Sequence, residues 1–195
     1  MFRQFMNFRS NTTANNSLDS ESATLAIVAL GANEYSPSGS PSATVQLVIG
    51  EIQKWNSKPL RRSSLWQSKP ADCPPGSPEF INAVIALEVG PEETPLDLLD
   101  RLQHLERQFG RKPQKYPNAP RCIDLDLICF GRLKCTHSRL TLPHPRAHLR
   151  GFVMFPLEEI APDMIFPEQN QTVAEIAKEL RDTPQAVWKL ETHTE

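Results

Sequence analysis

Two aspartates separated by one residue stand near the start of an apolar segment, Arg121–Phe130. If this segment is a strand, Asp124 and Asp126 point to the same face, because successive side chains alternate between faces. Same-face residues lie roughly 6.6 Å apart along a strand, at about 3.3 Å per residue. Two carboxylates at that spacing can share a pair of divalent cations, or bind one cation that also holds a phosphate chain. The alternative interpretation is an edge strand whose outer face is solvated.

The composition of the chain is that of a globular, soluble protein. It has 195 residues, of which 39% are hydrophobic and 23% charged, and its formal net charge is −2. A net charge this close to zero gives no indication of a basic surface that would bind nucleic acid. No apolar run approaches the length needed to cross a bilayer. Four cysteines without a Cys-x-x-Cys pair favour a reducing compartment. We therefore expect a cytoplasmic monomer that binds neither nucleic acid nor membranes.

Apolar patterns predict the elements that position the two aspartates. Helices are expected after Ser40 and after Thr94, each an N-cap residue followed by proline, and Asp97 stands where a capping-box acid would lie. Two short helices are expected near the C-terminus, over 152–160 and 173–180. Besides the acidic segment, strands are expected over two apolar runs, Thr24–Gly31 and Phe80–Val89, and over Arg61–Ser68 between them.

The order of these elements is strand–helix–strand–strand–helix–strand. It predicts an α+β fold of the ferredoxin-like split βαβ type, an antiparallel sheet with helices on one face, and the C-terminal helices would cover other edges. Long mobile loops are expected around the active site, over residues 69–79 and 111–120.

The chain divides into one domain and two ends. We expect a disordered extension over residues 1–23, which is rich in Asn, Ser and Thr, a single domain over 24–182, and a loosely ordered tail over 183–195.

Six short motifs, in this order along the chain, resemble the 6-hydroxymethyl-7,8-dihydropterin pyrophosphokinase family of folate biosynthesis. Each motif alone is weak, but six in register are specific. The motifs lie within Leu30–Asn33, Phe80–Val84, Leu105–Arg111, Pro120–Asp126, Leu142–Arg146 and Arg150–Pro162.

The resemblance implies transfer of pyrophosphate from ATP to the hydroxymethyl oxygen of the pterin, with release of AMP. Asp124 and Asp126 would hold two Mg²⁺ ions, which prefer oxygen ligands and keep several waters. Arg111 and Arg121 would clamp phosphate oxygens, because a planar guanidinium suits bidentate contact. These four are the predicted catalytic residues.

The resemblance also implies two sets of binding residues. In the pterin set, Asn82 would read the edge of the ring, Phe80 and Phe152 would stack on its two faces, and Ser68 and Ala71 would complete the pocket. The residues implied to bind ATP are Gln103, Glu106, Arg111, Arg121, Leu127, Arg139, Thr141, His144 and Arg150.

Structural alternatives stay open for several of these residues. Either phenylalanine could be a core residue, the arginines could be solvated loop charges, His144 could be structural between its prolines, and Glu106 could form a surface ion pair. The 111–121 loop also departs from the family, which often has Arg where Pro113 stands and Trp-Gly where Asn118-Ala119 stands. These departures put lid closure in doubt more than metal or ATP binding.

Three rival functions remain at this point. A paralogue could keep the fold and bind pterin or nucleotide without efficient transfer, which the altered loop favours slightly. A nucleotide-sugar transferase could use the Asp-x-Asp pair, but it leaves Asn82, Phe80 and His144 without a role. A ferredoxin-like interaction module would make the acids dispensable, because fold does not determine function.

Overall fold

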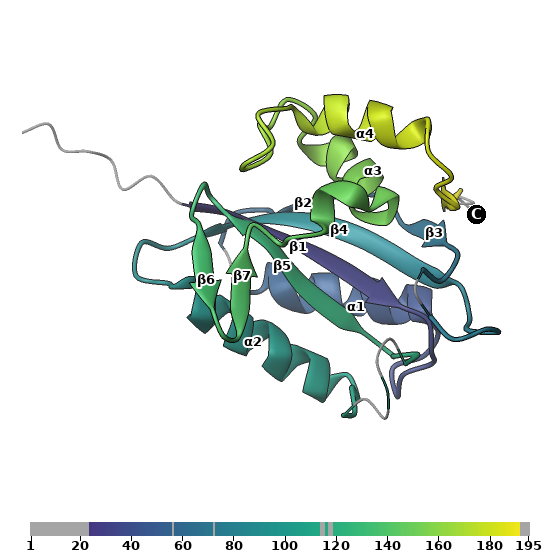
Figure 1. Cartoon of the computed structure of the whole chain (residues 1–195). Helices are drawn as coiled ribbons and strands as arrows, with labels where there is room; N and C mark the ends of the chain where they lie inside the picture. The colour runs from purple at the N-terminus through teal and green to yellow at the C-terminus, as the bar shows by residue number, and fades with distance from the viewer. Residues whose placement is uncertain (1–23, 56, 72, 114–115, 117–118, 192–195) are drawn as a thin grey trace, which may run out of the picture.

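The sheet of this protein lies between two layers of helices, as the computed structural model shows in Figure 1. The expected N-terminal extension lies outside the described part of the chain. The structure describes residues 24–55, 57–71, 73–113, 116 and 119–191.

The main sheet has the strand order β5-β1-β4-β3-β8, and β2 also pairs with β4. All of these pairings are antiparallel, as the sequence predicted. The strands are β1 (Thr24–Ala32), β2 (Arg61–Arg62), β3 (Trp66–Ser68), β4 (Phe80–Val89), β5 (Asp124–Phe130) and β8 (Val187–Lys189). A separate hairpin is formed by β6 (Cys135–His137) and β7 (Leu140–Leu142).

Helices α1 (Pro41–Gln53) and α2 (Pro95–Gln108) cover one face of this sheet. Both predicted N-caps are confirmed. The Ser40 side chain accepts a hydrogen bond from a backbone N–H of the first turn of α1, and Thr94 and Asp97 form a reciprocal capping box at α2. These caps satisfy N–H groups that have no partner within the helix.

Helices α3 (Gly151–Ile160) and α4 (Val173–Arg181) cover the opposite face. The expectation that the C-terminal helices cover edges of the sheet is therefore wrong. The alternation of β1 explains why a second layer is needed, because Val28 packs toward α1 and α2 while Ile27 packs toward α3 and α4, and both side chains are fully buried. A sheet that is apolar on both faces requires cover on both.

Two other expectations differ from the structure. The predicted strand over 61–68 is divided into β2 and β3, which both pair with β4. The predicted loose tail contains β8, which pairs with β3, so residues 187–189 lie beside that strand in Figure 1. No helix in the described ranges is both long and apolar enough to cross a bilayer.

Candidate active site

Asp124 and Asp126 open β5 and project from the same face of that strand. In the register with β1, Asp124 lies opposite Gly31 and Asp126 lies opposite Ala29. Leu125, between them, is buried in the core beneath α1 and α2, so the two carboxylates point away from that core. The predicted alternation is confirmed, and β5 is also an edge strand of the sheet.

Two arginines hold the carboxylate of Asp124. Arg121 donates from Nη1 to Asp124 Oδ2 across 2.7 Å, and Arg111 donates from Nη1 to Asp124 Oδ1. The same Arg111 nitrogen also donates to Glu106 Oε1, which accepts the backbone N–H of Leu125 at 2.7 Å. Glu106 on α2 therefore connects the loop arginine to the backbone between the two aspartates.

The buried carboxylates of this network hold protons more tightly than ordinary acids. Burial, and next the charge of Asp124, raise the pKa of Asp126 to about 6. Burial raises the pKa of Glu106 to about 7, despite the opposing charge of Arg111. Burial is the largest cause of both shifts, and arginine charges already oppose both; a cation bound at the carboxylates would lower these pKa values further.

His144 lies beside the same carboxylates as a neutral imidazole. Burial, followed by the charges of Arg150 and Arg146, lowers its pKa to about 4. Its backbone N–H donates to the Ile128 carbonyl at 2.8 Å, which fixes it to β5. Its Nδ1 accepts the backbone N–H of Arg146 at 3.3 Å, so the ring proton is carried by Nε2.

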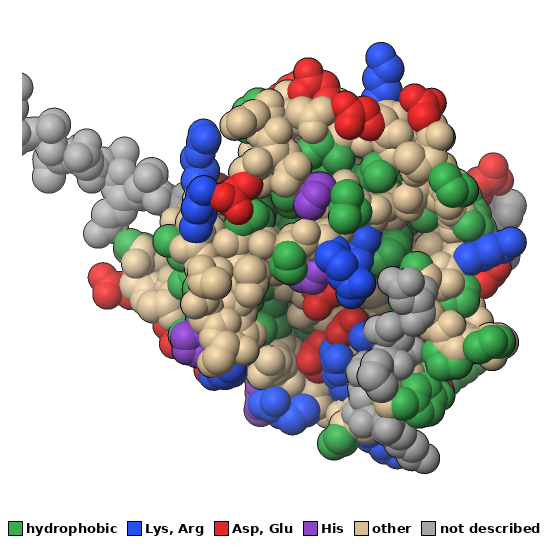
Figure 2. Space-filling view, viewed as in Figure 1, with side chains coloured by type: hydrophobic (Ala, Val, Ile, Leu, Met, Phe, Trp, Pro, Cys, Tyr) green, Lys and Arg blue, Asp and Glu red, His purple; other side chains and the backbone are tan. Residues whose placement is uncertain are grey.

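A cavity of about 690 Å³ opens beside the two aspartates. Figure 2 shows acidic, basic and histidine side chains gathered in a hollow at the centre of this face. The four predicted catalytic residues line the cavity, together with His144 and Arg150. All five residues predicted to bind pterin also line it: Ser68, Ala71, Phe80, Asn82 and Phe152.

Asn82 is buried at the floor of this cavity with its amide held in place. Its Nδ2 donates to Ser68 Oγ at 2.9 Å, and the residue is only 4% exposed. The amide oxygen of Asn82 faces Gly31 rather than Ser68. Gly31 is the residue opposite Asn82 in the pairing of β4 with β1. A buried, oriented amide is suited to recognising the polar edge of a flat ring.

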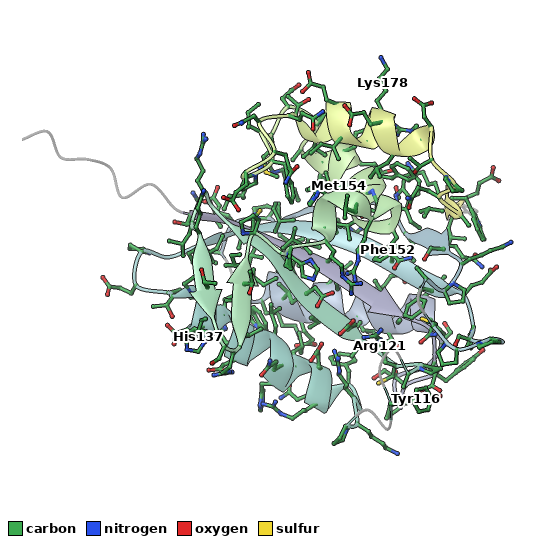
Figure 3. The ribbon with its side chains drawn as sticks, viewed as in Figure 1. Tyr116, Arg121, His137, Phe152, Met154 and Lys178 are labelled. Carbon is green, nitrogen blue, oxygen red and sulfur yellow. The ribbon has the colours of Figure 1, made fainter. Side chains whose placement is uncertain are left out.

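The two phenylalanines of the cavity each have a guanidinium over the ring. Arg121 lies 5.7 Å from the centroid of Phe80, and Arg150 lies 5.4 Å from the centroid of Phe152. In Figure 3, Arg121 lies beside the start of β5 and Phe152 lies in α3, at its first turn. Each aromatic wall is therefore joined to a cation near the acidic pair.

A second cavity, of about 340 Å³, lies on the α2 side of β5. Arg111, Asp124, Asp126 and His144 line both cavities, whereas Arg121 and Arg150 line only the first of these two. The other residues predicted to bind ATP line the second cavity: Gln103, Glu106, Leu127, Arg139 and Thr141.

Several residues of the first cavity were not singled out from the sequence. Arg146 lines it, and its position two residues after His144 in the same motif was a signal that could have identified it. Cys73 and Lys69 come from the Pro-rich loop. Residues 184–187 also line it, although that segment was expected to be a loose tail.

The altered part of the 111–121 loop is described only in part. Pro113 and Ala119 line a third cavity of about 470 Å³, while Asn118 lies outside the described residues.

Sequence comparison identifies the group of proteins to which this chain is similar. The family model for 7,8-dihydro-6-hydroxymethylpterin-pyrophosphokinase matches residues 27–162. A 2-amino-4-hydroxy-6-hydroxymethyldihydropteridine pyrophosphokinase of Synechocystis is 36% identical over 164 residues, which is 84% of this chain and 78% of that protein. The protein of the same name in Haemophilus influenzae is 35% identical over 158 residues, 80% of this chain and 93% of its own length.

Comparison with solved structures supports the same fold. The wild-type HPPK-DHPS of Plasmodium falciparum superposes with a TM-score of 0.61 at 12% identity, over 83% of this chain and 42% of that one. This chain thus spans less than half of that structure, and the likeness concerns the fold alone. Because the family model covers residues 27–162 and the two bacterial relatives align over most of their lengths, the chain belongs to the 7,8-dihydro-6-hydroxymethylpterin-pyrophosphokinase family.

Proposed function

We propose that this protein transfers pyrophosphate from ATP to the hydroxymethyl group of 6-hydroxymethyl-7,8-dihydropterin and releases AMP, as a step of folate biosynthesis. The proposal includes two Mg²⁺ ions held by Asp124 and Asp126, and a monomer acting in the cytoplasm. Family membership and the names of the bacterial relatives support the reaction.

One observation carries the proposal: the two aspartates line both cavities. The first cavity has aromatic walls and a buried amide, which suit a flat heterocycle. The second cavity adjoins it at Asp124 and Asp126. A donor nucleotide in the second cavity and an acceptor alcohol in the first would therefore meet at the carboxylates, and such alignment supplies much of the rate of a phosphoryl-type transfer.

The donor set at this meeting point fits magnesium. Both candidate ligands are carboxylates, whose oxygen atoms are the kind of ligand that magnesium prefers. Magnesium accepts few protein ligands when phosphates and waters complete its shell. When bound, it would neutralise triphosphate charge and lower the pKa of the acceptor hydroxyl.

The side chains of the protein supply charge and orientation. Arg111 and Arg121 lie against Asp124, within reach of phosphate oxygens placed at the two carboxylates. His144, with its proton on Nε2, is a neutral donor for a nucleotide oxygen. Phe80, Phe152 and Asn82 orient the pterin. Direct transfer between two aligned substrates requires no covalent intermediate with the protein.

The test is an AMP-release assay with ATP, Mg²⁺ and 6-hydroxymethyl-7,8-dihydropterin. The native protein should turn over only with a divalent cation, and Asp126→Asn should lower kcat by about 10²–10³-fold while the protein stays folded. Asp163→Asn, which changes an exposed aspartate in the turn after α3, is the matched control and should keep native activity.

Two outcomes would refute parts of the proposal. Equal AMP release from the native protein and Asp126→Asn would show that the metal assignment is wrong. Binding of pterin and ATP without AMP release by the native protein would favour the non-transferring paralogue.

A further inference from the structure

The C-terminal segment, here residues 183–190, returns to the first cavity after α4. Residues 184–187 line the cavity wall. Its strand β8 pairs with β3 so that Val187 lies opposite Ser68, and the backbone N–H of Lys69 donates to the Ala186 carbonyl at 3.0 Å. The segment therefore supports the residue that holds the Asn82 amide.

The side chain of Gln185 joins the starting end of α3 to the final turn of α4. Its Oε1 accepts the backbone N–H of Gly151, the first residue of α3, at 3.0 Å. Its Nε2 donates to Thr183 Oγ1 at 3.2 Å, and Thr183 Oγ1 donates to the Leu180 carbonyl at 2.7 Å. A side-chain oxygen at this position satisfies one of the unpaired N–H groups of a helix N-terminus. In the part of the chain that the structure describes, the N-cap residue Arg150 makes no side-chain cap hydrogen bond to α3.

Gly151 and Gln185 fit each other closely. A Cβ added at Gly151 would lie 2.8 Å from Gln185 Oε1 and 3.2 Å from Gln185 Cβ. Both distances are shorter than comfortable van der Waals contact, so the glutamine occupies the space that a side chain at 151 would need. The next residue is Phe152, one of the two aromatic walls of the cavity.

We infer that the C-terminal segment is a third wall of the pterin site and that Gln185 is a positioning residue, which holds the first turn of α3 and with it Phe152. The inference rests on the proposed function of the first cavity. The family match ends at residue 162, so this role belongs to a part of the chain that the match does not reach. A wall that is fixed before the ligand arrives avoids the entropic cost of ordering it on binding.

The location of the segment predicts a selective effect. Residues 184–187 line the first cavity, and none of them lines the second. Loss of the Gln185 hydrogen bond should therefore weaken pterin binding and leave nucleotide binding unchanged. A general loss of fold would weaken both.

The experiment compares Gln185→Ala with the conservative Gln185→Glu in the full-length protein. For Gln185→Ala we expect the KM for 6-hydroxymethyl-7,8-dihydropterin to rise about threefold to tenfold, the range for one lost hydrogen bond. The KM for ATP and kcat should remain native. Gln185→Glu keeps an acceptor for the Gly151 N–H, and its charge suits a helix N-terminus, so it should restore most of the pterin affinity.

Two further variants sharpen the test. Gly151→Ala should also raise the pterin KM, because the new Cβ would lie 2.8 Å from Gln185 Oε1, although it would also lie 3.0 Å from the buried ring of Phe155. Gln171→Ala is the matched control, since Gln171 makes one side-chain hydrogen bond to Glu179 at the surface and lies outside the cavity; it should keep native constants.

The result that overturns the inference is distinct from failure of the proposed function. An unchanged pterin KM in Gln185→Ala, or an equal rise in both KM values, would refute the positioning role. If the native protein released no AMP, the proposed function would fail, and direct titration of the intrinsic fluorescence of the pterin with native and Gln185→Ala protein would still decide the inference.

Discussion

The guanidinium of Arg121 donates to the carboxylate of Asp124 across 2.7 Å, and Arg111 holds the other oxygen of that carboxylate. Both oxygens of one candidate metal ligand are thus occupied by cations of the protein itself. A metal ion and the two guanidiniums carry charge of the same sign, and they compete for the same carboxylate lone pairs. Both arginines therefore lie where the oxygens of an incoming phosphate chain can replace the Asp124 carboxylate as their hydrogen-bond acceptors.

Arg121→Ala should separate the competition of this arginine with a metal ion from its stabilisation of phosphate charge. We expect the free protein to bind Mn²⁺ more tightly, because one competing cation is removed, and kcat to fall by about 10²–10³-fold because a charge-stabilising donor is lost. Titration of Mn²⁺ by electron paramagnetic resonance, without nucleotide, measures the first effect. Arg132→Ala changes an exposed arginine in the turn after β5 and should change neither. Weaker Mn²⁺ binding by Arg121→Ala would contradict the competition.

The buried acid Glu106 should make stability depend on pH. Its folded pKa of about 7 lies above the ordinary value of 4.5, so the folded state binds more protons than the unfolded state between these values. This contribution to stability is complete below pH 4.5 and is lost as the pH rises through 7, by at most about 1.4 kcal/mol per pH unit. Glu106→Gln should keep the bond to the Leu125 N–H and lose this dependence.

Denaturant unfolding at pH 5 and pH 8, with metal chelated, checks this expectation. The other titrating groups contribute equally to both proteins, so their effect drops out of the difference in unfolding free energy between Glu106→Gln and the native protein. The stability of the variant relative to the native protein should be greater at pH 8 than at pH 5. Glu92→Gln, in an exposed turn, is the control. A difference that is independent of pH would show that Glu106 is not protonated in the folded protein.

Local signals account for the parts of the fold that the sequence predicted correctly. The capping residues Ser40 and Thr94 act within a few residues of their own positions, and the alternation that places Asp124 and Asp126 on one face is a property of any strand. The family motifs supplied the rest of the site, and the residues that they implied do line the two adjoining cavities.

The parts that the sequence did not predict depend on pairings between distant segments. Strand β8 is three residues long and exists because it pairs with β3; its own pattern is too short to indicate a strand. Helices α3 and α4 cover one face of the sheet because they pack against residues such as Ile27 and Val84, which are far away in the sequence. Gln185 could not be assigned, because its partner Gly151 is brought to it only by the fold.

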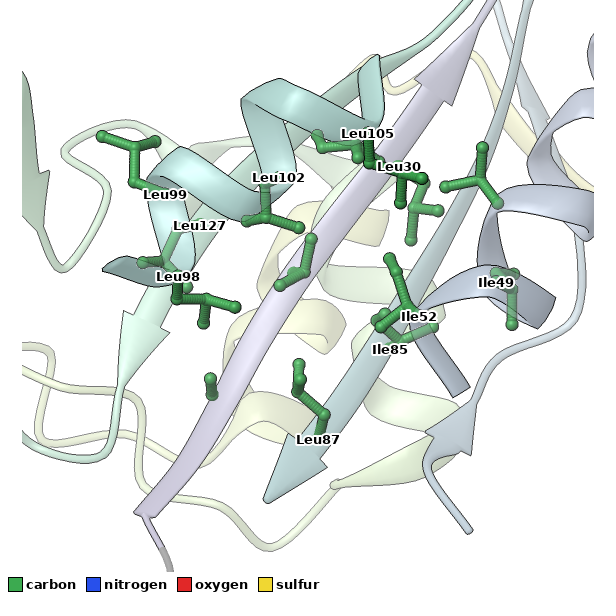
Figure 4. Packing of buried hydrophobic residues seen from close by; sticks show 14 of the residues in the cluster. Leu30, Ile49, Ile52, Ile85, Leu87, Leu98, Leu99, Leu102, Leu105 and Leu127 are labelled. Carbon is green, nitrogen blue, oxygen red and sulfur yellow. The ribbon is translucent and has the colours of Figure 1, made fainter. Parts of the chain in front are cut away.

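The core beneath α2 should be sensitive to a cavity. Leu102 is fully buried among the apolar residues shown in Figure 4, and Leu102→Ala should lower the free energy of unfolding by about 2–5 kcal/mol. Leu47 on α1 is 49% exposed, so Leu47→Ala is a matched control with an expected loss below about 1 kcal/mol. Equal losses measured by chemical denaturation would show that the two helices do not pack as described.

His144 should remain neutral, with its proton on Nε2, throughout the physiological range. Its folded pKa of about 4 lies below the ordinary value of 6.5, so the unfolded chain binds more protons between these values. The corresponding stability is present above pH 6.5 and is lost as the pH falls through 4. The acceptor contact of Nδ1 with the Arg146 N–H requires the same tautomer.

Nuclear magnetic resonance of protein labelled with ¹⁵N-histidine observes this state directly. The His144 ring should show one protonated and one unprotonated nitrogen at pH 6, with the protonated one at Nε2, and the His144→Asn variant identifies the signals by removing them. Because burial disfavours a positively charged imidazole and Arg150 and Arg146 repel it, a titration midpoint above pH 6 would mean that the ring is more exposed, or lies farther from these guanidiniums, than in the structure. A neutral ring is also what allows His144 to donate from Nε2 without adding charge beside the two arginines.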